Sequence, residues 1–424
     1  MTGLAARVTL LREEVWGSAG RRSRVAWVAA VASVAAALAF ICWIPVHSYQ
    51  ADINVYLWGG RNAFAPNLYS LALKRSGLGF TYTPFAAILF VPMARLLPVF
   101  PAEELWNVVN VFFLVALLHV SARATNGTIT RVHALRFAMI CTLPAFFLDP
   151  VFLTMGFGQI NLLLVLLIVW DLAGKRGAIG SRVPQGIATG IACAIKLTPL
   201  IFVPYLLITR RTRAALTCLA TFFACSIGSF IATPTASTAY WTKDAYDAKR
   251  VGGIYFISNQ DLNAVLSRLL HEPVPAKLLA PLVILFGLGG LALAAWAKLR
   301  SSEMLGLLVC ATAGLIVSPI TWAHHLVWIV PVLVWLFIGD DRPARGTILA
   351  IGAAILFWAT PIWWVPRHGL RELHEVFWQY VAGNSFFFAM VLFLFATAAM
   401  LFVRSRWRPE DGPGDELGRA DGLV

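Results

Sequence analysis

Long apolar stretches recur along almost the whole chain, and they restrict its fold more than any other feature. A helix needs about 20 apolar residues to cross a hydrocarbon core about 30 Å thick. Only 13% of the 424 residues are charged, against about 25% in an ordinary soluble domain. A chain this long with so few charges cannot cover a globular surface. We therefore expect an integral membrane protein, rather than a secreted enzyme, a disulfide scaffold or a nucleic-acid-binding domain.

The apolar runs predict an all-α polytopic bundle of about twelve transmembrane helices. The first run follows a cluster of arginines and is too long for a typical signal-peptide core, so we interpret it as an anchored span. Two short runs after residue 183 have basic clusters at their far ends, which favours a hairpin turning at Lys196. The predicted spans are residues 25–46, 104–122, 134–153, 159–174, 184–197, 199–209, 214–233, 277–297, 304–318, 323–338, 346–362 and 384–403.

The basic residues predict the orientation of these spans. The net charge is +13, and in a membrane protein an excess of Lys and Arg marks the cytoplasmic loops. We interpret the run 82–97 as a re-entrant or interfacial helix on the outer side, so that the cytoplasmic segments hold 22 of the 34 basic residues. This topology gives a cytoplasmic N-terminal arm over 1–24, a membrane domain over 25–403, and a disordered cytoplasmic tail over 404–424.

On this topology the ionisable residues that a membrane disfavours gather on the outer side, where they are candidates for function. Asp52 follows the first span, and Tyr56 and Tyr82 are among the aromatic residues of that region. A carboxylate placed there suits a general base for a sugar hydroxyl, and a helix N-cap is the structural alternative. Lys196 suits a lipid phosphate, with snorkelling to the headgroups as its alternative.

Two further groups of polar residues are candidates. His324 and His325 start a late apolar helix, and adjacent residues lack the i, i+4 spacing of a two-histidine metal site. One histidine that faces a cavity and contacts a phosphate or a hydroxyl is the better interpretation. The loop 234–276 carries Asn259 and Gln260, whose amides suit sugar hydroxyls, although a plain surface loop has a similar composition.

Sequence motifs for a soluble donor or a metal are missing from the chain. It has no GxxxxGK[ST] phosphate-binding loop, no GxGxxG after a strand, and no DxD motif. The six cysteines lie in apolar stretches without metal-site spacing, which is typical of buried packing. We therefore expect neither a metal nor a cofactor, and an activated lipid is a simpler donor than a nucleotide sugar.

Six motifs, in order from about residue 50 to 335, resemble glycosyltransferase family 87. These enzymes are GT-C-type membrane transferases that use polyprenyl-phosphate sugars. The motifs are Asp52-Ile-Asn-Val-Tyr56, Phe80-Thr-Tyr-Thr-Pro-Phe85, Gly158-Gln-Ile-Asn161, Gly190 to Lys196-Leu-Thr-Pro199, Ser258-Asn-Gln260 and Ser318-Pro-Ile-Thr-Trp-Ala-His-His325.

The resemblance implies an α-mannosyltransferase of the plasma membrane that uses polyprenyl-phosphate mannose as donor. It also implies a phosphatidylinositol mannoside or lipomannan/lipoarabinomannan acceptor, an α-1,2 linkage, and an inverting reaction on the extracytoplasmic face. Asp52 matches the catalytic base of GT-C enzymes. The donor phosphate is expected at Lys196, His324 and His325. The expected substrate-binding residues are Tyr56, Tyr82, Gln159, Asn161, Asn259 and Gln260.

Three alternatives remain open at the level of sequence. The family also contains arabinofuranosyltransferases that use decaprenyl-phosphate arabinose. A transporter of a polyprenyl-linked sugar has a similar composition, although inverted repeats, which would favour transport, are not evident. A structural membrane scaffold is the third alternative.

Overall fold

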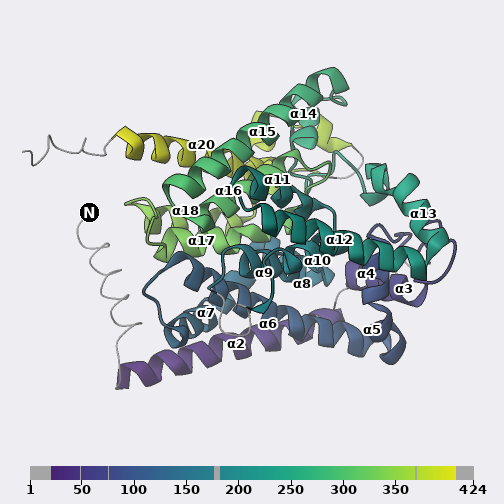
Figure 1. Cartoon of the computed structure of the whole chain (residues 1–424), viewed down its shortest axis with the longest axis horizontal. Helices are drawn as coiled ribbons and strands as arrows, with labels where there is room; N and C mark the ends of the chain where they lie inside the picture. Colours follow the sequence, from purple (N-terminus) through teal and green to yellow (C-terminus); the bar gives the residue numbers. More distant parts are fainter. Residues whose placement is uncertain (1–20, 48, 75, 176–181, 368–369, 407–424) are drawn as a thin grey trace, which may run out of the picture.

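The computed structural model describes residues 21–47, 49–74, 76–175, 182–367 and 370–406. Most helices in these ranges run along the long axis of the molecule (Figure 1). Extended structure in the described residues is limited to two isolated bridges, Ala72 with Gly79 and Asn259 with Trp322. The fold is therefore all-α, as predicted. Most of the predicted N-terminal arm and C-terminal tail lies outside the described residues.

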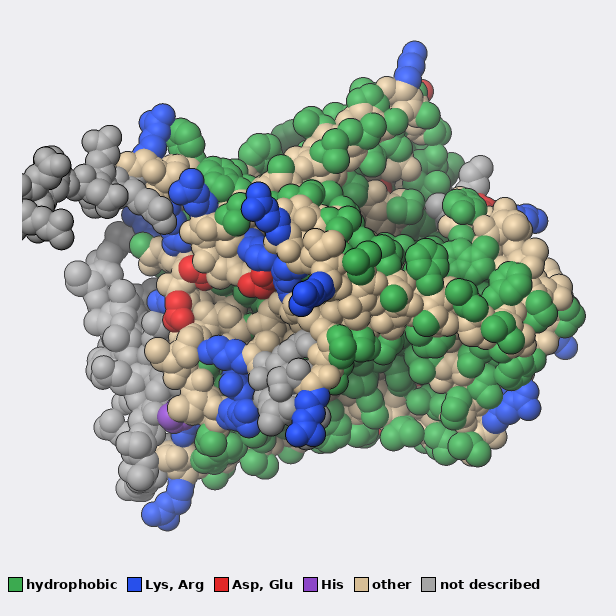
Figure 2. Space-filling model, in the orientation of Figure 1, with side chains coloured by type: hydrophobic (Ala, Val, Ile, Leu, Met, Phe, Trp, Pro, Cys, Tyr) green, Lys and Arg blue, Asp and Glu red, His purple; other side chains and the backbone are tan. Residues whose placement is uncertain are grey.

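Six helical segments of the described chain are long and apolar enough to cross a membrane. Their exposed surfaces are largely hydrophobic, as Figure 2 shows along the flanks of the molecule. Such side chains face lipid at no cost, whereas polar backbone groups at that depth must be paired inside the helix. The segments are α2 (Arg21–His47), α6 (Val99–Thr125), α12 (Thr212–Ala232), α15 (Ala276–Arg300), α18 (Gly346–Ala359) with η6 (Pro361–Trp363), and α20 (Ser385–Arg406).

The predicted count of about twelve transmembrane helices is not confirmed. Several predicted spans form helices of only 9 to 15 residues, and at 1.5 Å per residue these are shorter than the hydrocarbon core. Apolar runs in the sequence do not reveal where a helix stops inside the protein. The short helices are α9 (Asn161–Leu172), α10 (Ile187–Ile195), η2 (Thr198–Ile201) with α11 (Phe202–Ile208), α16 (Glu303–Val317), and η5 (Ala323–Trp328) with α17 (Ile329–Ile338).

The predicted span 134–153 is not one straight helix. It forms α7 (Arg131–Phe146) and α8 (Asp149–Phe157), which meet at an angle of 81°. Pro150 occupies the first turn of α8, a position where its fixed φ and missing N–H favour the start of a helix. The two helices count as one broken span or as a re-entrant segment.

The segment 82–97 forms two six-residue helices, α4 (Pro84–Leu89) and α5 (Val91–Leu96), instead of one helix. Both lie beside α3 (Ala51–Arg61) at the right end of Figure 1. The start of α2 and the end of α20 lie at the opposite end of the molecule. The remaining helices are α13 (Pro234–Thr242), η3 (Asp244–Tyr246), η4 (Ala248–Val251), α14 (Leu262–Leu270), η7 (Arg371–His374) and α19 (Phe377–Gly383).

The two predicted runs on either side of Lys196 form α10 and, after η2, α11. Gly186 and Gly190 allow α10 to approach α12 closely, because a Cβ at either position would lie 2.2 to 2.6 Å from an α12 atom. The backbone leaves the helical conformation at Lys196, which is extended at φ −144° and ψ 133°. A helix interruption inside a membrane protein is tolerated where it is buried in protein or lines a cavity.

Three interruptions of this kind meet inside the bundle. They are Gly158 to Ile160 between α8 and α9, Lys196 to Leu197 between α10 and η2, and Ser318 to Trp322 between α16 and η5. Helices that flank different interruptions contact one another: η5 contacts α8 and α9, α9 contacts α10, and α16 contacts η2. The fold therefore brings non-helical backbone and polar side chains to one place.

Candidate active site

The start of α3 places Asp52 directly after the first long helix. Gln50 is the N-cap residue, so Asp52 lies within the first turn and is not the cap. The buried Gln50 amide donates to Asn107 Oδ1 of α6 at 3.1 Å and to the Met155 carbonyl of α8 at 3.2 Å. These contacts fix the start of α3 against two other helices, and the Asp52 side chain is only partly exposed.

The environment of Asp52 favours its protonated form more than water does. Burial raises the pKa of Asp52 to about 6, while a hydrogen bond with Gln159 and the positive charge of Lys196 act in the opposite direction. Burial disfavours a charged carboxylate because the surrounding protein solvates it less well than water. A carboxylate with a pKa near the working pH is suited to accept a proton.

Gln159 connects Asp52 to two tyrosines. Gln159 Oε1 lies 2.8 Å from the Tyr56 hydroxyl and 3.1 Å from the Tyr82 hydroxyl, and the two hydroxyls lie 2.8 Å apart. Because Oε1 accepts from the tyrosines, the amide nitrogen of Gln159 is left to donate to Asp52. Four candidate residues from three separate segments thus form one polar cluster.

Lys196 lies on the other side of this cluster. Its ammonium is 2.8 Å from His325 Nε2, 3.4 Å from Asn161 Oδ1, and 5.8 Å from the centre of the Tyr82 ring. The backbone N–H of Trp322 donates to His325 Nδ1 at 3.2 Å. Lys196, Asn161 and His325 therefore come together although they lie up to 164 positions apart in the sequence.

The His324 side chain has different contacts from that of His325. Its ring contacts those of Phe157 and His325 edge to face, and its two ring nitrogens are buried without a hydrogen-bond partner in the described structure. Its carbonyl accepts hydrogen bonds from Thr154 at 3.1 Å and from the Asn161 amide at 2.9 Å. These bonds attach the Ser318 to Trp322 interruption to α8 and α9.

Asn259 and Gln260 lie outside the cluster. Their side-chain amides bond to backbone groups: Asn259 to Ile254 and Thr321, and Gln260 to residues 257, 383 and 387. Both side chains are fully buried. In this structure Asn259 attaches its loop to the segment before His324 and His325, and Gln260 attaches the same loop to α19 and the start of α20. Neither amide is directed at the cluster.

A buried polar face of α6 was missed at the level of sequence. Glu103, Asn107 and Asn110 are all buried, and their i, i+4, i+7 spacing places them on one side of the helix. Glu103 Oε1 accepts from Asn54 of α3 at 2.6 Å, and Asn107 accepts from Gln50. This periodicity inside an apolar span was the signal that could have revealed the partners of α3.

Gly158 allows α3 and Gln159 to approach each other. Its φ is +68°, and a Cβ at this position would lie 2.6 Å from Ile53 Cγ2, beside Asp52. We expect Gly158→Ala to lower the free energy of unfolding by about 1–3 kcal/mol and to reduce enzymatic turnover, because α3 must move. Thermal unfolding and turnover measure both effects. Gly156→Ala, two residues earlier in α8, is the control, since its Cβ would meet no atom within 4 Å. Equal effects of the two substitutions would contradict the prediction.

A small cavity of about 60 Å³ lies beside the cluster and is lined by Lys196, Asn161 and His325. A much larger apolar groove of about 600 Å³ lies between α16, α17, α18 and α20. The two cavities adjoin, with Leu315 and Trp328 forming part of the wall of each. Within the described residues, no three His, Cys, Asp or Glu side chains are grouped to hold a metal ion.

The chain is similar in sequence to one family of known enzymes. The profile of glycosyltransferase family 87 matches residues 80–319. A polyprenol-phosphate-mannose-dependent alpha-(1-2)-phosphatidylinositol pentamannoside mannosyltransferase of Mycobacterium tuberculosis is 35% identical over 346 residues, which are 80% of this chain and 76% of that protein.

Two further relatives are polyprenol-phosphate-mannose-dependent alpha-(1-2)-phosphatidylinositol mannoside mannosyltransferases. The protein from Mycobacterium tuberculosis is 31% identical over 402 residues, covering 88% of this chain and 90% of the relative. The protein from Mycolicibacterium smegmatis is 31% identical over 398 residues, covering 87% of each. No solved structure matches this chain. The profile match and the extent of these alignments show that the chain belongs to glycosyltransferase family 87 and is a membrane glycosyltransferase.

Proposed function

We propose that this enzyme transfers mannose from polyprenyl-phosphate mannose to a mannosylated lipid, a phosphatidylinositol mannoside or lipomannan/lipoarabinomannan, through an α-1,2 linkage. The observation that carries the proposal is the cluster in which a carboxylate, Asp52, lies near the ammonium of Lys196, which in turn contacts His325. The proposed sugar, donor and acceptor class are those that the names of the relatives give.

The proposed reaction is a single displacement that inverts the anomeric centre. The acceptor oxygen forms a bond to the anomeric carbon, the bond from that carbon to the phosphate oxygen breaks, and Asp52 takes the acceptor proton. The bonding electrons leave with the polyprenyl phosphate. Tyr56, Tyr82 and Gln159 would hold sugar hydroxyls and orient the carboxylate, because they already form a hydrogen-bonded group around it.

Lys196 and His325 would hold the departing phosphate. With Nδ1 of His325 accepting from Trp322, the ring proton lies on Nε2, so two nitrogen donors stand 2.8 Å apart. An anion between such donors relieves their repulsion and is bound by both. Charge that develops on the leaving phosphate in the transition state is stabilised by these fixed donors. Asn161 helps to position Lys196, whereas His324 provides a second imidazole behind His325.

The groove between α16, α17, α18 and α20 would hold the polyprenyl chain of the donor. Its walls are almost entirely apolar, and it shares Leu315 and Trp328 with the small cavity that Lys196 lines. From there it extends to Pro343 and Met400, near the opposite end of α17 and α20. A long hydrocarbon chain in such a groove would keep the phosphate at Lys196 while the sugar reaches Asp52.

The reaction would take place on the extracytoplasmic side of the plasma membrane. The described ends of α2 and α20 lie at the left end of Figures 1 and 2, where many Lys and Arg side chains also gather. Positive residues favour the cytoplasmic side, and α3, α4 and α5 lie at the other end.

The orientation predicts which cysteines an impermeant maleimide can reach in whole cells. In a variant without native cysteines, Ser70→Cys should be labelled from outside, because Ser70 is exposed near α3. Thr128→Cys, exposed in the turn between α6 and α7, should be labelled only after the membrane is opened. Labelling of position 128 in intact cells would reverse the proposed orientation.

The state of Asp52 predicts an acid limb in the pH profile. Below a pH of about 6 the carboxylate takes up a proton and can no longer act as a base, so kcat/KM should fall as the pH decreases. Between pH 6 and 7.5 the carboxylate is mostly ionised and the rate should level off. The profile is measured with purified enzyme, and a rate that rises continuously from pH 7 down to pH 5 would exclude Asp52 as the base.

The substrate proposal is tested with purified enzyme in detergent. The enzyme is given polyprenyl-phosphate [¹⁴C]mannose and a phosphatidylinositol mannoside, and the product is digested with an α-1,2-specific mannosidase. We expect a radiolabelled glycolipid that the mannosidase degrades. Transfer from decaprenyl-phosphate arabinose, without transfer from the mannose donor, would replace the proposal with an arabinosyltransferase.

A further inference from the structure

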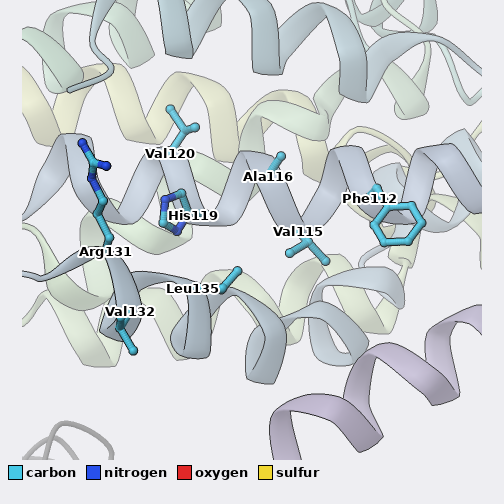
Figure 3. A pocket seen from close by; sticks show the side chains of 8 residues that line it. All are labelled: Phe112, Val115, Ala116, His119, Val120, Arg131, Val132 and Leu135. Carbon is cyan, nitrogen blue, oxygen red and sulfur yellow. The ribbon is translucent and has the colours of Figure 1, made fainter. Parts of the chain in front are cut away.

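A third cavity lies away from the candidate site, in the groove between α6 and α7 (Figure 3). Its volume is about 420 Å³. The two helices are joined by a short turn over residues 126–130, and exposed apolar side chains leave the groove open toward the lipid. Phe112, Val132 and Leu135 on its walls are between 40% and 58% exposed. The remaining apolar walls are Val115, Ala116 and Val120.

One end of this groove is cationic. Arg131 of α7 and His119 of α6 line it, and Figure 3 shows both side chains at the same end. Arg131 and Arg123 both lie close enough to the His119 ring to interact with it electrostatically. His119 Nδ1 and Arg123 Nε are buried and lack a hydrogen-bond partner in the described structure. No partner of the Arg131 side chain is found among the described residues either, so guanidinium donors of Arg123 and Arg131 remain available here.

The surroundings add positive charge to this end. Lys175 Nζ donates to the carbonyls of Asn126 and Gly127 at 3.0 Å each. The neighbouring carboxylate of Asp340 accepts from the backbone N–H of Gly127 at 2.6 Å. His133 and Arg136 follow Arg131 on α7. The groove therefore ends in a positive field at the end of the bundle that holds both described chain ends.

We propose that this groove binds an anionic phospholipid, with its phosphate between Arg123, Arg131 and His119 and one acyl chain along the apolar walls. The combination selects the ligand: the arginines require an anion, and the apolar walls above them require a hydrocarbon chain. Basic pockets between helices at the cytoplasmic end of membrane proteins bind anionic headgroups in this way. A zwitterionic lipid fits less well, because its own ammonium group would meet the same cations.

Such a lipid would bridge α6 and α7. Arg123 belongs to the last turns of α6 and Arg131 begins α7, so one phosphate bound to both holds the turn between them closed. A ligand that binds only the folded protein stabilises it by mass action. Added anionic phospholipid should therefore raise the melting temperature of the delipidated enzyme, independently of any sugar substrate.

The test compares dioleoyl phosphatidylglycerol with dioleoyl phosphatidylcholine on delipidated protein in detergent. Native mass spectrometry measures the bound lipid, and thermal unfolding measures the stabilisation. We expect phosphatidylglycerol to bind and to raise the melting temperature. In Arg131→Gln its affinity should fall about tenfold or more, as expected when a charge-assisted hydrogen bond is lost. Equal retention of the two lipids, or unchanged retention in Arg131→Gln, would overturn the proposal.

Matched variants separate this site from general charge and general hydrophobicity. Arg213→Gln removes the same charge from an exposed position at the start of α12 and should leave phosphatidylglycerol binding unchanged. Ala116→Trp fills the groove and should reduce binding, whereas Ile355→Trp on the exposed face of α18 should not. Inorganic phosphate should not reproduce the thermal shift. If phosphate alone reproduces it, the site binds a soluble anion and the lipid assignment is wrong.

Discussion

Replacement of Asp52 by Asn is expected to lower kcat by a factor of about 10² to 10⁴, the range that general-base catalysis contributes. The amide has the shape of the carboxylate and can still accept from Gln159, but it cannot take the acceptor proton. Expression and thermal unfolding should remain close to those of the wild type, because relief from burying a carboxylate offsets the lost attraction to Lys196. Transfer of radiolabelled mannose measures the effect.

Asp149→Asn is the matched control for this experiment. Asp149 is a second buried carboxylate; its Oδ1 accepts from the Trp363 ring nitrogen at 2.8 Å, and an Asn oxygen can accept the same bond. Asp149 lies at the other end of α8 from Gln159, so its substitution should change the rate by only a few-fold. Near-normal transfer by Asp52→Asn would remove Asp52 from the mechanism, whatever the result for Asp149.

Replacement of Lys196 by Met should lower kcat/KM by a factor of about 10² to 10³, comparable to the loss of one fixed donor at a developing anion. The methionine keeps much of the length of the side chain and removes its charge. His325 then contacts the leaving phosphate alone. Kinetics with varied donor concentration measure the loss, and inhibition by added polyprenyl phosphate should weaken in parallel, because product and donor share the phosphate site.

Lys298→Met serves as the control for loss of a partly buried lysine. Lys298 pairs with Glu303 at 3.2 Å and lies at the end of α15, so its substitution should alter stability rather than inhibition by polyprenyl phosphate. Lys196→Arg should retain part of the activity, since the charge remains although its shape differs. If Lys196→Met were inhibited by polyprenyl phosphate as strongly as the wild type, the phosphate would have to bind elsewhere.

The sequence revealed the charged candidates of the cluster because a charged side chain next to an apolar stretch carries a free-energy penalty. Asp52, Lys196 and His325 interrupt or border apolar stretches, and a charged group at membrane depth persists only with a partner or a wet cavity. That argument needs no knowledge of the fold. The same reasoning did not distinguish Asn259 and Gln260 from the cluster, since an amide that binds backbone groups and one that binds a sugar look alike in a sequence.

The lengths of the helices could not be predicted in the same way. Hydropathy reports whether a segment tolerates lipid, and it reports equally on a segment that packs inside the protein. The helices α9, α10 and α16 are apolar, yet α9 begins only at Asn161, and α10 and α16 end before Lys196 and Ser318. Backbone carbonyls near two of these points accept from distant side chains, Gly158 from Trp106 and Ala194 from Thr83. The bond between Thr154 and the His324 carbonyl joins residues 170 positions apart.

The sequence by itself determined that the chain is an all-α membrane protein and which few polar residues were candidates for function, because burial in lipid penalises charge wherever a helix lies. Only the tertiary structure decided that three helix interruptions meet, that Gln159 joins Asp52 to two tyrosines, and that Lys196 faces His325. Those pairings depend on the packing of distant helices. Local sequence fixes the cost of each polar group but not the partner that compensates it.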